Sequence, residues 1–272
     1  MSLPVLPAML TAYLEPWGLV PDGEPMLSPN GQLLPVRCEG LPAMLKVATE
    51  EEEKRGAALM AWWQGQGAAR VLAHGGDALL LERAQGPRSL DELARHGHDE
   101  EACRIMCEVV ARLHTPRAAP LPVLTDLRPW FQALHHCAGV QVQGGIFATA
   151  AATATALLAG PQDVVALHGD IHHGNILDFG PRGWLAIDPK GLVGERGVDY
   201  ANLFCNPDAQ TATDPARFER RLEVVAAAAG LEPQRLLQWI LAWAGLSAAW
   251  HLEDGSNPDT ALAVAHMAAA RL

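Results

Sequence analysis

One polar loop constrains this 272-residue chain more than any other feature of its sequence. The stretch LHGDIHHGNIL, Leu167 to Leu177, places Asp170 and Asn175 between two short apolar runs. A second aspartate, Asp188, follows beyond another apolar run, in the sequence AIDPKG. Short apolar runs bounded by polar residues predict strands. The pattern therefore predicts strand ends that bring two carboxylates and an amide to one site.

The same loop contains three histidines, which raises the alternative of a zinc site. The spacing of His168, His172 and His173 fits no common zinc pattern, and the sequence offers no obvious fourth ligand. An aspartate followed five positions later by an asparagine is instead typical of a catalytic base and a magnesium ligand on one loop. The sequence therefore favours phosphate chemistry.

The first 83 residues predict strands and one helix. Met26 to Gly40 predicts a hairpin with its turn at Ser28-Pro29-Asn30-Gly31. Ala43 to Val47 and Asp77 to Glu82 predict further strands. Acids in the first turn and apolar residues on one face predict a helix from Glu50 to Trp63.

A Gly-Pro segment separates this strand-rich part from a larger, mainly helical part. Arg83 to Arg88, RAQGPR, predicts a hinge, and Ser89 with Glu92 predicts the capped start of a helix. We therefore expect an α+β fold with one lobe over residues 1–83 and another over residues 84–272. The apolar run Leu236 to Trp250 is too short for a membrane span, so it predicts a buried helix.

The net charge of −11 bears on the partners of the protein. Nucleic acid and anionic membrane surfaces attract basic proteins, so we expect neither as a partner. An acidic protein suits a cationic small molecule. The five cysteines include no CxxC pair, and the N-terminal segment has no positively charged start. Both features predict a cytoplasmic protein.

Four features along the chain match what phosphoryl transfer from ATP requires. A strand lysine, Lys46, can neutralise the α- and β-phosphates, and an acid on the next helix can hold it. Asp170 can accept the proton of the attacking hydroxyl. Asn175 and Asp188 can hold Mg²⁺ on the phosphates. The complete set predicts an enzyme that uses ATP and Mg²⁺.

The acid that pairs with Lys46 is one of four consecutive glutamates, Glu50 to Glu53. Acids in a first turn also suit the helix dipole as ordinary solvated residues, so their presence alone does not identify the partner. Glu53 is the best placed of the four, and we expect it to pair with Lys46.

The motif HGDIHHGN resembles the catalytic loop of the aminoglycoside phosphotransferases, which are relatives of the protein kinases. IDPKG stands where kinases carry their Asp-Phe-Gly triplet. The chain resembles the streptomycin 6-phosphotransferases, within the aminoglycoside/hydroxyurea antibiotic resistance kinases, from about Leu33 to its C-terminus. The stretches that carry this resemblance are PAMLKVA, GAALMAWWQGQGAARVLA, LHGDIHHGNILDFGPRGWLAIDPKGLVGER, VDYANLFCNP and RLLQWILAWAGLSAAW.

The resemblance implies a two-lobed, protein-kinase-like fold whose smaller lobe binds ATP. Asp170 would be the catalytic base, and Asn175 and Asp188 would bind Mg²⁺. The implied reaction transfers the γ-phosphoryl group of ATP to the 6-hydroxyl of streptomycin, which inactivates the antibiotic.

The resemblance also implies where the nucleotide binds. Lys46, paired with Glu53, would contact the α- and β-phosphates. The backbone of Glu82, Arg83 and Ala84 would meet adenine, while His168 would brace the catalytic loop by hydrogen bonds.

The chain departs from the wider kinase pattern. It has no G-x-G-x-x-G motif over the phosphates, and the stretch from Ser28 to Gly31 is the candidate replacement. His168-Gly169-Asp170 replaces the His-Arg-Asp of protein kinases, and no A-P-E-like segment is present. Both departures indicate a small-molecule kinase rather than a protein kinase.

An aromatic residue beside acids gives candidates for substrate binding. Trp250 precedes Glu253 and Asp254, and such a group can hold a guanidinium or an amine by cation–π contact and ion pairs. An acidic loop behind a core tryptophan explains the same residues. Glu195 is a further candidate, while Arg196 and Asp199 can form a structural ion pair.

Two other functions fit the same residues. A kinase for hydroxyurea or another small hydroxylated metabolite would use the same fold and the same ATP site. A nucleotide-binding pseudokinase would keep the fold without turnover, but Lys46, Asp170, Asn175 and Asp188 are all present.

Overall fold

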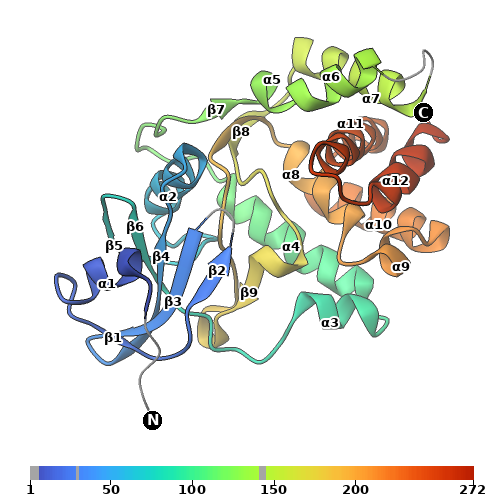
Figure 1. The fold of residues 1–272 in the computed structure, drawn as a ribbon. Helices are drawn as coiled ribbons and strands as arrows, with labels where there is room; N and C mark the ends of the chain where they lie inside the picture. The colour runs from blue at the N-terminus through green and yellow to red at the C-terminus, as the bar shows by residue number, and fades with distance from the viewer. Residues whose placement is uncertain (1–5, 29–30, 141–144) are drawn as a thin grey trace.

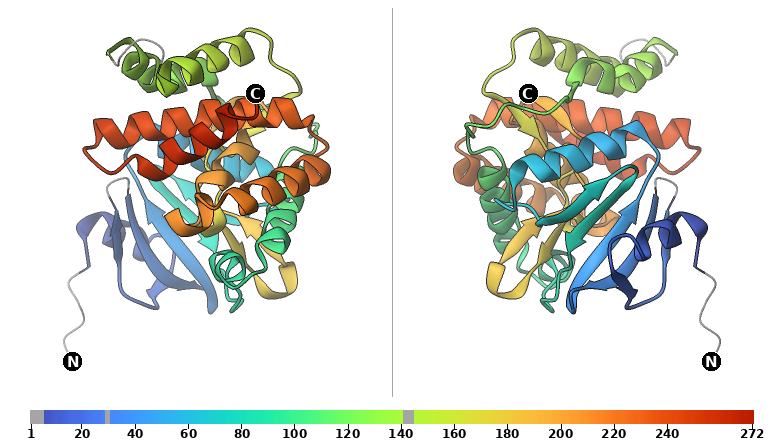
Figure 2. Two further views of the ribbon diagram at one scale, coloured as in Figure 1. Left: turned by 90° about the vertical axis from the view of Figure 1, so that its right-hand side faces the viewer. Right: turned by 90° about the vertical axis from the view of Figure 1, so that its left-hand side faces the viewer.

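The computed structural model describes residues 6–28, 31–140 and 145–272, which fold into two lobes (Figures 1 and 2). The smaller lobe contains an antiparallel sheet with strand order β1-β3-β4-β6-β5, and β2 pairs with β3. The larger lobe is mainly helical. The expected α+β class is confirmed, while the division at residues 83 and 84 stays a prediction.

The helices and strands of each lobe follow in chain order. The smaller lobe contains α1 (Ala8–Leu14), β1 (Leu19–Pro21), β2 (Met26–Ser28), β3 (Gly31–Cys38), β4 (Leu41–Val47), α2 (Glu51–Trp63), β5 (Val71–Gly75) and β6 (Ala78–Glu82). The first part of the larger lobe contains α3 (Leu90–Arg95), α4 (Asp99–Leu113), β7 (Thr125–Asp126), α5 (Leu127–Trp130), α6 (Gln132–Val140), α7 (Ile146–Ala159), β8 (Val164–Leu167), η1 (His173–Asn175), β9 (Ile176–Asp178), η2 (Gly180–Arg182), β10 (Trp184–Ala186) and β11 (Leu192–Glu195). The remaining elements are α8 (Val198–Ala201), η3 (Asn202–Cys205), α9 (Ala209–Ala212), α10 (Pro215–Ala229), α11 (Pro233–Glu253) and α12 (Asp259–Ala269).

Side-chain alternation gives the sheet of the smaller lobe two different faces. On β4, Ala43, Leu45 and Val47 are buried in a core that also contains Leu10 of α1. The intervening Lys46 therefore projects from the opposite face, toward the larger lobe. The period of two along this strand is what delivers a lysine to the space between the lobes.

The predicted hairpin is present, because Met26 pairs with Leu33 and Leu27 with Gln32 in antiparallel register. Its turn residues Pro29 and Asn30 lie outside the described residues. The expectation of a single helix in this lobe was wrong, since α1 precedes the sheet. Helix α1 has no acid in its first turn and no side-chain cap, so its sequence carries no start signal.

Helix α11 runs through the larger lobe, where it packs against α7, α12 and α6 (Figure 2). Most of its residues from Leu236 to Ala249 are buried, which confirms the predicted buried helix. Within the described residues, the structure contains no helix that combines the length and apolarity needed to cross a membrane.

The polar loop Gly169–His172 joins β8 to the short helix η1 that precedes β9. Strands β9 and β10 pair antiparallel, so the chain returns beside the loop after one hairpin. The backbone N–H of Ile187 donates to the carbonyl of Asn175 at 2.9 Å, and that of Lys190 donates to the carbonyl of His168 at 2.7 Å. These bonds fix Asp188 next to the loop that carries Asp170.

Candidate active site

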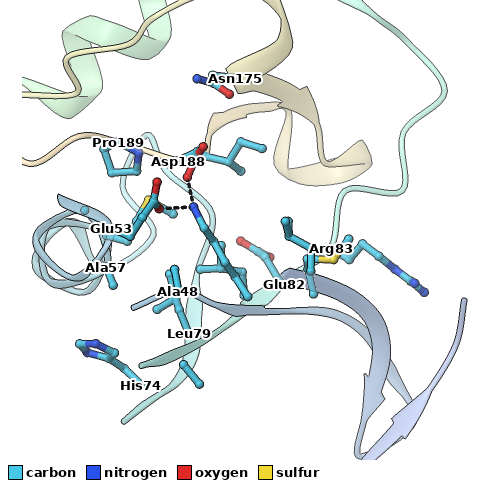
Figure 3. Close-up of a pocket in the computed structure, with 18 of the residues that line it drawn as sticks. Ala48, Glu53, Ala57, His74, Leu79, Glu82, Arg83, Asn175, Asp188 and Pro189 are labelled. Atoms are coloured by element: carbon cyan, nitrogen blue, oxygen red, sulfur yellow. Dashed lines mark hydrogen bonds and ion pairs between the residues drawn. The ribbon is translucent and has the colours of Figure 1, made fainter. Parts of the chain in front are cut away.

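A cavity of about 640 Å³ lies between the lobes (Figure 3). Its lining comes from the sheet, helix α2, the segment after β6 and the β9–β10 region. Apolar side chains such as Met44, Leu79 and Leu177 form much of its wall, whereas Lys46 and Asp188 supply charge. The volume lies within the usual range for a small-molecule site.

Lys46 forms ion pairs with both Glu53 and Asp188. Dashed lines in Figure 3 mark these contacts with Glu53 of α2 and with Asp188. The side chains of Lys46 and Glu53 are 15% and 6% exposed, so the pair is shielded from water. Among the four consecutive acids, Glu53 is therefore the one that contacts Lys46, and Glu51 pairs with the exposed Lys54 instead.

Two glycines allow α2 to approach the segment that carries Asp188. A Cβ atom on Gly56 would lie 2.1 Å from the carbonyl oxygen of Pro189. A Cβ atom on Gly191, whose φ is +68°, would lie 2.9 Å from the backbone of Arg55. Helix α2 and the segment from Asp188 to Gly191 are therefore packed backbone to backbone.

Asp188 adopts a φ of +62°, which non-glycine residues rarely do. Burial alone would raise the pKa of its carboxyl, but Lys46 and Lys190 lower it, and the net pKa lies below the usual value. Asp188 is thus held as a carboxylate in a strained conformation, which is a common feature of functional sites.

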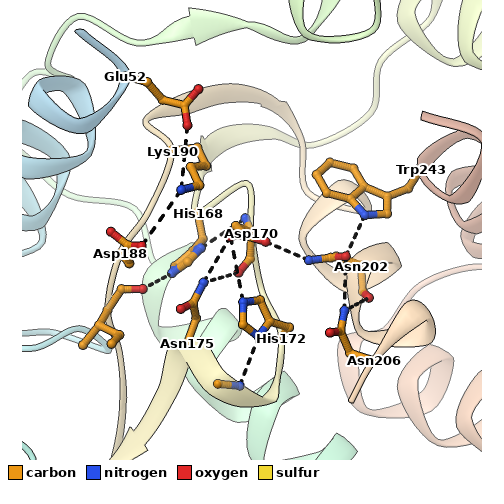
Figure 4. Close-up of polar contacts among 12 residues, drawn as sticks. Glu52, His168, Asp170, His172, Asn175, Asp188, Lys190, Asn202, Asn206 and Trp243 are labelled. Carbon is orange, nitrogen blue, oxygen red and sulfur yellow. Dashed lines mark hydrogen bonds and ion pairs between the residues drawn. The ribbon is translucent and has the colours of Figure 1, made fainter. Parts of the chain in front are cut away.

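Lys190 is a charged residue of this site that the sequence reasoning did not single out. Its Nζ lies 3.7 Å from Glu52 Oε1 and 4.0 Å from Asp188 Oδ2 (Figure 4). It also lies 3.7 Å from Glu53 Oε1. Burial would lower the pKa of Lys190, but the charges of Asp188 and Asp170 raise it above its usual value. Lys190 is therefore a second cation near the acids of the cleft. Its position in the stretch IDPKG, two residues after Asp188, was the sequence signal that could have identified it.

The loop residues Asp170 and Asn175 contact each other directly. Asn175 Nδ2 donates to the backbone carbonyl of Asp170 at 2.9 Å and to its Oδ2 at 3.3 Å. Because Nδ2 is engaged, Oδ1 is the atom of Asn175 left for the cavity that this residue lines. The side chain of Asp170 is 29% exposed, so it remains accessible to a second molecule.

His168 braces the loop as expected. Its Nε2 lies 2.7 Å from the carbonyl of Ile187, and its Nδ1 accepts the backbone N–H of Asp170 at 3.2 Å. These contacts require a neutral ring with the proton on Nε2. Full burial lowers the pKa of His168, which favours the same neutral form.

Asp199 holds the loop from the other side. Its two carboxylate oxygens accept the backbone N–H groups of His168 and Gly169 at 2.9 and 2.7 Å, and His114 Nε2 lies 2.8 Å away. The expected pairing of Asp199 with Arg196 was wrong, because Arg196 contacts Asp163 instead. Two backbone N–H groups of the loop and the ring of His114 are the contacts of the Asp199 carboxylate.

The three expected hinge residues all line the cavity. The backbone N–H groups of Glu82 and Arg83 already donate to Arg70 and Pro42 within the lobe. The side chain of Glu82 pairs with Arg182, and that of Arg83 pairs with Asp22. Ala84 N–H donates no hydrogen bond within the described ranges, so it is the hinge donor left for a ligand.

Glu195 does not reach the cavity, which corrects its proposed part in substrate binding. It is 2% exposed, and its oxygens accept from Arg235, Trp239 Nε1 and the backbone N–H of Gln162. Strand β11 turns this side chain into the interior of the larger lobe, where the arginine neutralises its charge.

The other substrate candidates lie at the C-terminal end of α11. Trp250 packs edge-on against Trp130 and Trp243, with ring centroids 5.6 and 5.9 Å away. Glu253 and Asp254 are exposed. None of the three lines the cavity of Figure 3, so their part in substrate binding stays a prediction.

Comparison with solved structures identifies the fold. Aminoglycoside phosphotransferase APH(4)-Ia, solved as a thermostable mutant in a ternary complex with ADP and hygromycin B, aligns with a TM-score of 0.61. The alignment covers 96% of each chain at 18% identity. A choline/ethanolamine kinase family protein from Mesorhizobium loti aligns with a TM-score of 0.64 over 97% of this chain and 93% of that chain, at 16% identity. The fold is therefore that of the protein-kinase-like phosphotransferases.

Sequence comparison gives more similar relatives. Streptomycin 3''-kinase of Klebsiella pneumoniae is 52% identical over 89% of this chain and 92% of its own. Streptomycin 6-kinase of Streptomyces griseus is 30% identical over 97% and 88%, and hydroxyurea phosphotransferase of Kitasatospora aureofaciens is 31% identical over 96% and 78%. The family profile described as aminoglycoside/hydroxyurea antibiotic resistance kinase matches residues 16–255. The chain belongs to this family of phosphotransferases.

Proposed function

We propose that this enzyme transfers the γ-phosphoryl group of ATP to a hydroxyl group of streptomycin. The observation that carries the proposal is the position of Lys46 between Glu53 and Asp188, with Asp170 and Asn175 on the adjoining loop. Phosphoryl transfer needs this combination of a phosphate-binding lysine, oxygen ligands for a metal and a base. The relatives named as streptomycin kinases support the acceptor.

The residues present fit both ATP and Mg²⁺. The cavity has apolar walls for a purine, and Ala84 offers a free backbone donor at the hinge. Asn175 Oδ1 and the carboxylate of Asp188 are the hard oxygen ligands that Mg²⁺ prefers. When bound, Mg²⁺ would neutralise charge on the phosphates of the nucleotide. The negatively charged groups of the cleft suit this cation.

The contacts of the protein groups support the following roles. Lys46, held by Glu53, orients the α- and β-phosphates. Asp170 accepts the proton of the acceptor hydroxyl while the oxygen of that hydroxyl bonds to the γ-phosphorus and the bond to ADP breaks. Lys190 adds positive charge beside Asp188, where the transferred group carries negative charge.

The acceptor position that we propose is the 6-hydroxyl of the streptidine ring, as the sequence resemblance predicts. The 30%-identical relatives named streptomycin 6-kinase support it. The name of the 52%-identical relative favours the 3''-hydroxyl instead. Either product places negative charge on a drug that binds its target through positive charge, which accounts for inactivation.

Mg²⁺-dependent ADP release with streptomycin, other aminoglycosides and hydroxyurea tests the proposal. We expect fast release with streptomycin and none in Asp170→Asn, which should still bind ATP. Phosphorus–proton NMR of the product then identifies the phosphorylated hydroxyl. A variant Asp170→Asn with near-normal turnover would reject the assigned base, and release with hydroxyurea alone would move the acceptor to that compound, for which one relative is named.

A further inference from the structure

A chain of hydrogen bonds connects the proposed base to the middle of helix α11 (Figure 4). Asn202 Nδ2 donates to Asp170 Oδ1 at 2.9 Å, and Trp243 Nε1 donates to Asn202 Oδ1 at 2.8 Å. Asn202 is 8% exposed and Trp243 is 3% exposed. The chain therefore links an accessible carboxylate to the interior of the larger lobe.

The indole of Trp243 decides which way the amide of Asn202 points. An indole N–H can only donate, so the amide atom that faces it must be the oxygen. Asn206 Nδ2 lies 3.4 Å from the same oxygen and donates to the backbone carbonyl of Asn202 at 3.0 Å. The amide nitrogen of Asn202 must then face Asp170. A reversed amide would set two oxygens against each other at Asp170 and two donors against each other at Trp243.

The anchor behind this chain is itself rigid. Arg221 is 1% exposed and pairs with Asp99 at 2.6 Å. Its second amino group donates to the backbone carbonyls of Leu203 and Asn206, at 3.1 and 2.7 Å. The short helix η3, which starts at Asn202, is thus fixed to α10 and α4. Asn202 has little freedom to follow a displaced Asp170.

The two oxygens of Asp170 consequently differ. Oδ1 is held by Asn202, whereas among the described residues Oδ2 has the longer contact of 3.3 Å with Asn175 and a distance of 3.9 Å to His172 Nε2. Fixing one oxygen restricts the rotation of the carboxylate, so the other oxygen of this partly exposed side chain keeps one direction. Such pre-orientation lowers the cost of reaching the reactive geometry.

We propose that Asn202 is a positioning residue for the phosphotransfer reaction, that Trp243 sets its amide orientation, and that Asp170 Oδ2 is the oxygen that receives the proton. This inference rests on the proposed function, because it assigns Asp170 as the base. Neither residue touches the reacting atoms. Their effect is expected in the catalytic step and not in nucleotide binding.

Steady-state kinetics of Asn202→Ala, Trp243→Phe and the double variant test the proposal. We expect Asn202→Ala to lower kcat by about 10- to 100-fold while KM for ATP changes by no more than about twofold. Trp243→Phe should lower kcat less, since the amide can still adopt the productive orientation part of the time. The double variant should match Asn202→Ala, because Trp243 acts through Asn202. Losses that multiply in the double variant would overturn the proposal.

Trp239 provides a matched control on the same helix. Its indole N–H is also buried and donates at 2.7 Å, but to Glu195, which leads away from Asp170. Trp239→Phe should therefore lower stability about as much as Trp243→Phe and leave kcat unchanged. An equal loss of kcat in both variants would reduce the role of Trp243 to packing and overturn the proposal.

A spectroscopic measurement separates this inference from the proposed function. The indole ¹H–¹⁵N resonance of Trp243, assigned by its loss in Trp243→Phe, should move in Asn202→Ala and in Asp170→Ala. The Trp239 resonance should stay in place. This result is expected even if no acceptor is phosphorylated, in which case the proposed function alone fails. If the Trp243 resonance has the wild-type chemical shift in both variants, the hydrogen bonds do not connect Asp170 to Trp243. That result would overturn the proposal, whichever acceptor is phosphorylated.

Discussion

Asn175 uses its side-chain nitrogen to hold Asp170, at 2.9 Å from the backbone carbonyl and 3.3 Å from the carboxylate. The same amide then presents its oxygen to the cavity. One side chain therefore couples the proposed base to the proposed metal site. Its two functions belong to different atoms, so two substitutions can separate them.

Asn175→Asp keeps an oxygen for Mg²⁺ but loses the N–H donor, whereas Asn175→Ala loses both. We expect kcat to fall by about 10- to 100-fold in each variant, because both release Asp170. The Mg²⁺ concentration for half-maximal activity should rise clearly only in Asn175→Ala. Titration of activity with Mg²⁺ measures both effects. Equal Mg²⁺ requirements in the two variants would contradict the assignment of Asn175 Oδ1 as a ligand.

Glu53 and Glu51 lie two positions apart in the same helical turn, which makes them a natural pair for comparison. Glu53→Gln should lower kcat/KM for ATP by about tenfold or more, since Lys46 loses a shielded anionic partner. Glu51→Gln should change it little, because Glu51 is 76% exposed and pairs with a surface lysine. Steady-state kinetics with varied ATP checks both. A similar loss in the two variants would show that the charge of the turn matters rather than the contact.

The sequence predicted those parts of the site that depend on local pattern. The apolar run Ala43 to Val47 indicated the strand that carries Lys46, and the runs beside the loop indicated strands at β8, β9 and β10. The acid-rich turn indicated the start of α2, which begins at Glu51. Each of these follows from neighbours in the chain.

Contacts between distant segments could not be predicted in the same way. The interior position of Glu195 depends on Arg235, forty residues later, and Asp199 depends on backbone N–H groups thirty residues earlier. Asn202 sits in an apolar helical stretch whose local pattern gives no reason to single it out. The packing of α8, η3 and α11 determines which side chains meet. The periodic pattern of neighbouring residues does not predict this packing.

The free energy of unfolding should depend on pH through the carboxyl group of Asp199. Burial alone would raise the pKa of its carboxyl, but the hydrogen bonds from His114 and from the backbone N–H of Gly169 hold the pKa below its ordinary value of 3.8. The unfolded chain therefore takes up this proton first as the pH falls. The contribution of Asp199 is complete above the unfolded-state pKa and is lost as the pH falls through the lower folded-state pKa.

Asp199→Asn lacks this titration. We expect its free energy of unfolding at pH 7 to be lower than that of the wild type by about 2 kcal/mol, because an amide cannot accept both backbone N–H groups as well. The difference between the two proteins should narrow as the pH falls below 3.8. Urea unfolding from pH 7 to pH 3 measures it. A difference that stays constant over this range would mean that the carboxyl charge contributes nothing.

Gly56 allows a test of the contact between α2 and Pro189. Gly56→Ala would place a Cβ atom 2.1 Å from a carbonyl oxygen, so the helix must move. We expect a loss of about 1–3 kcal/mol in stability and a fall in kcat, because Glu53 moves with the helix. Gly139→Ala in α6 is the control, since its Cβ would meet no atom of the described residues within 4 Å and alanine favours a helix. Thermal unfolding should show a lower stability for Gly56→Ala and a higher stability for Gly139→Ala. Kinetics should show a fall in kcat for Gly56→Ala alone.

The contact of Gly56 with Pro189 also bears on regulation. Protein kinases are switched by moving the helix that carries the lysine's acidic partner toward or away from the nucleotide. Here that helix is packed without a gap against the backbone of the segment that carries Asp188. Any outward swing would have to carry this segment with it, so the helix cannot serve as an independent switch. The contact therefore ties the position of Glu53 to that of Asp188, so that Lys46 meets both acids together.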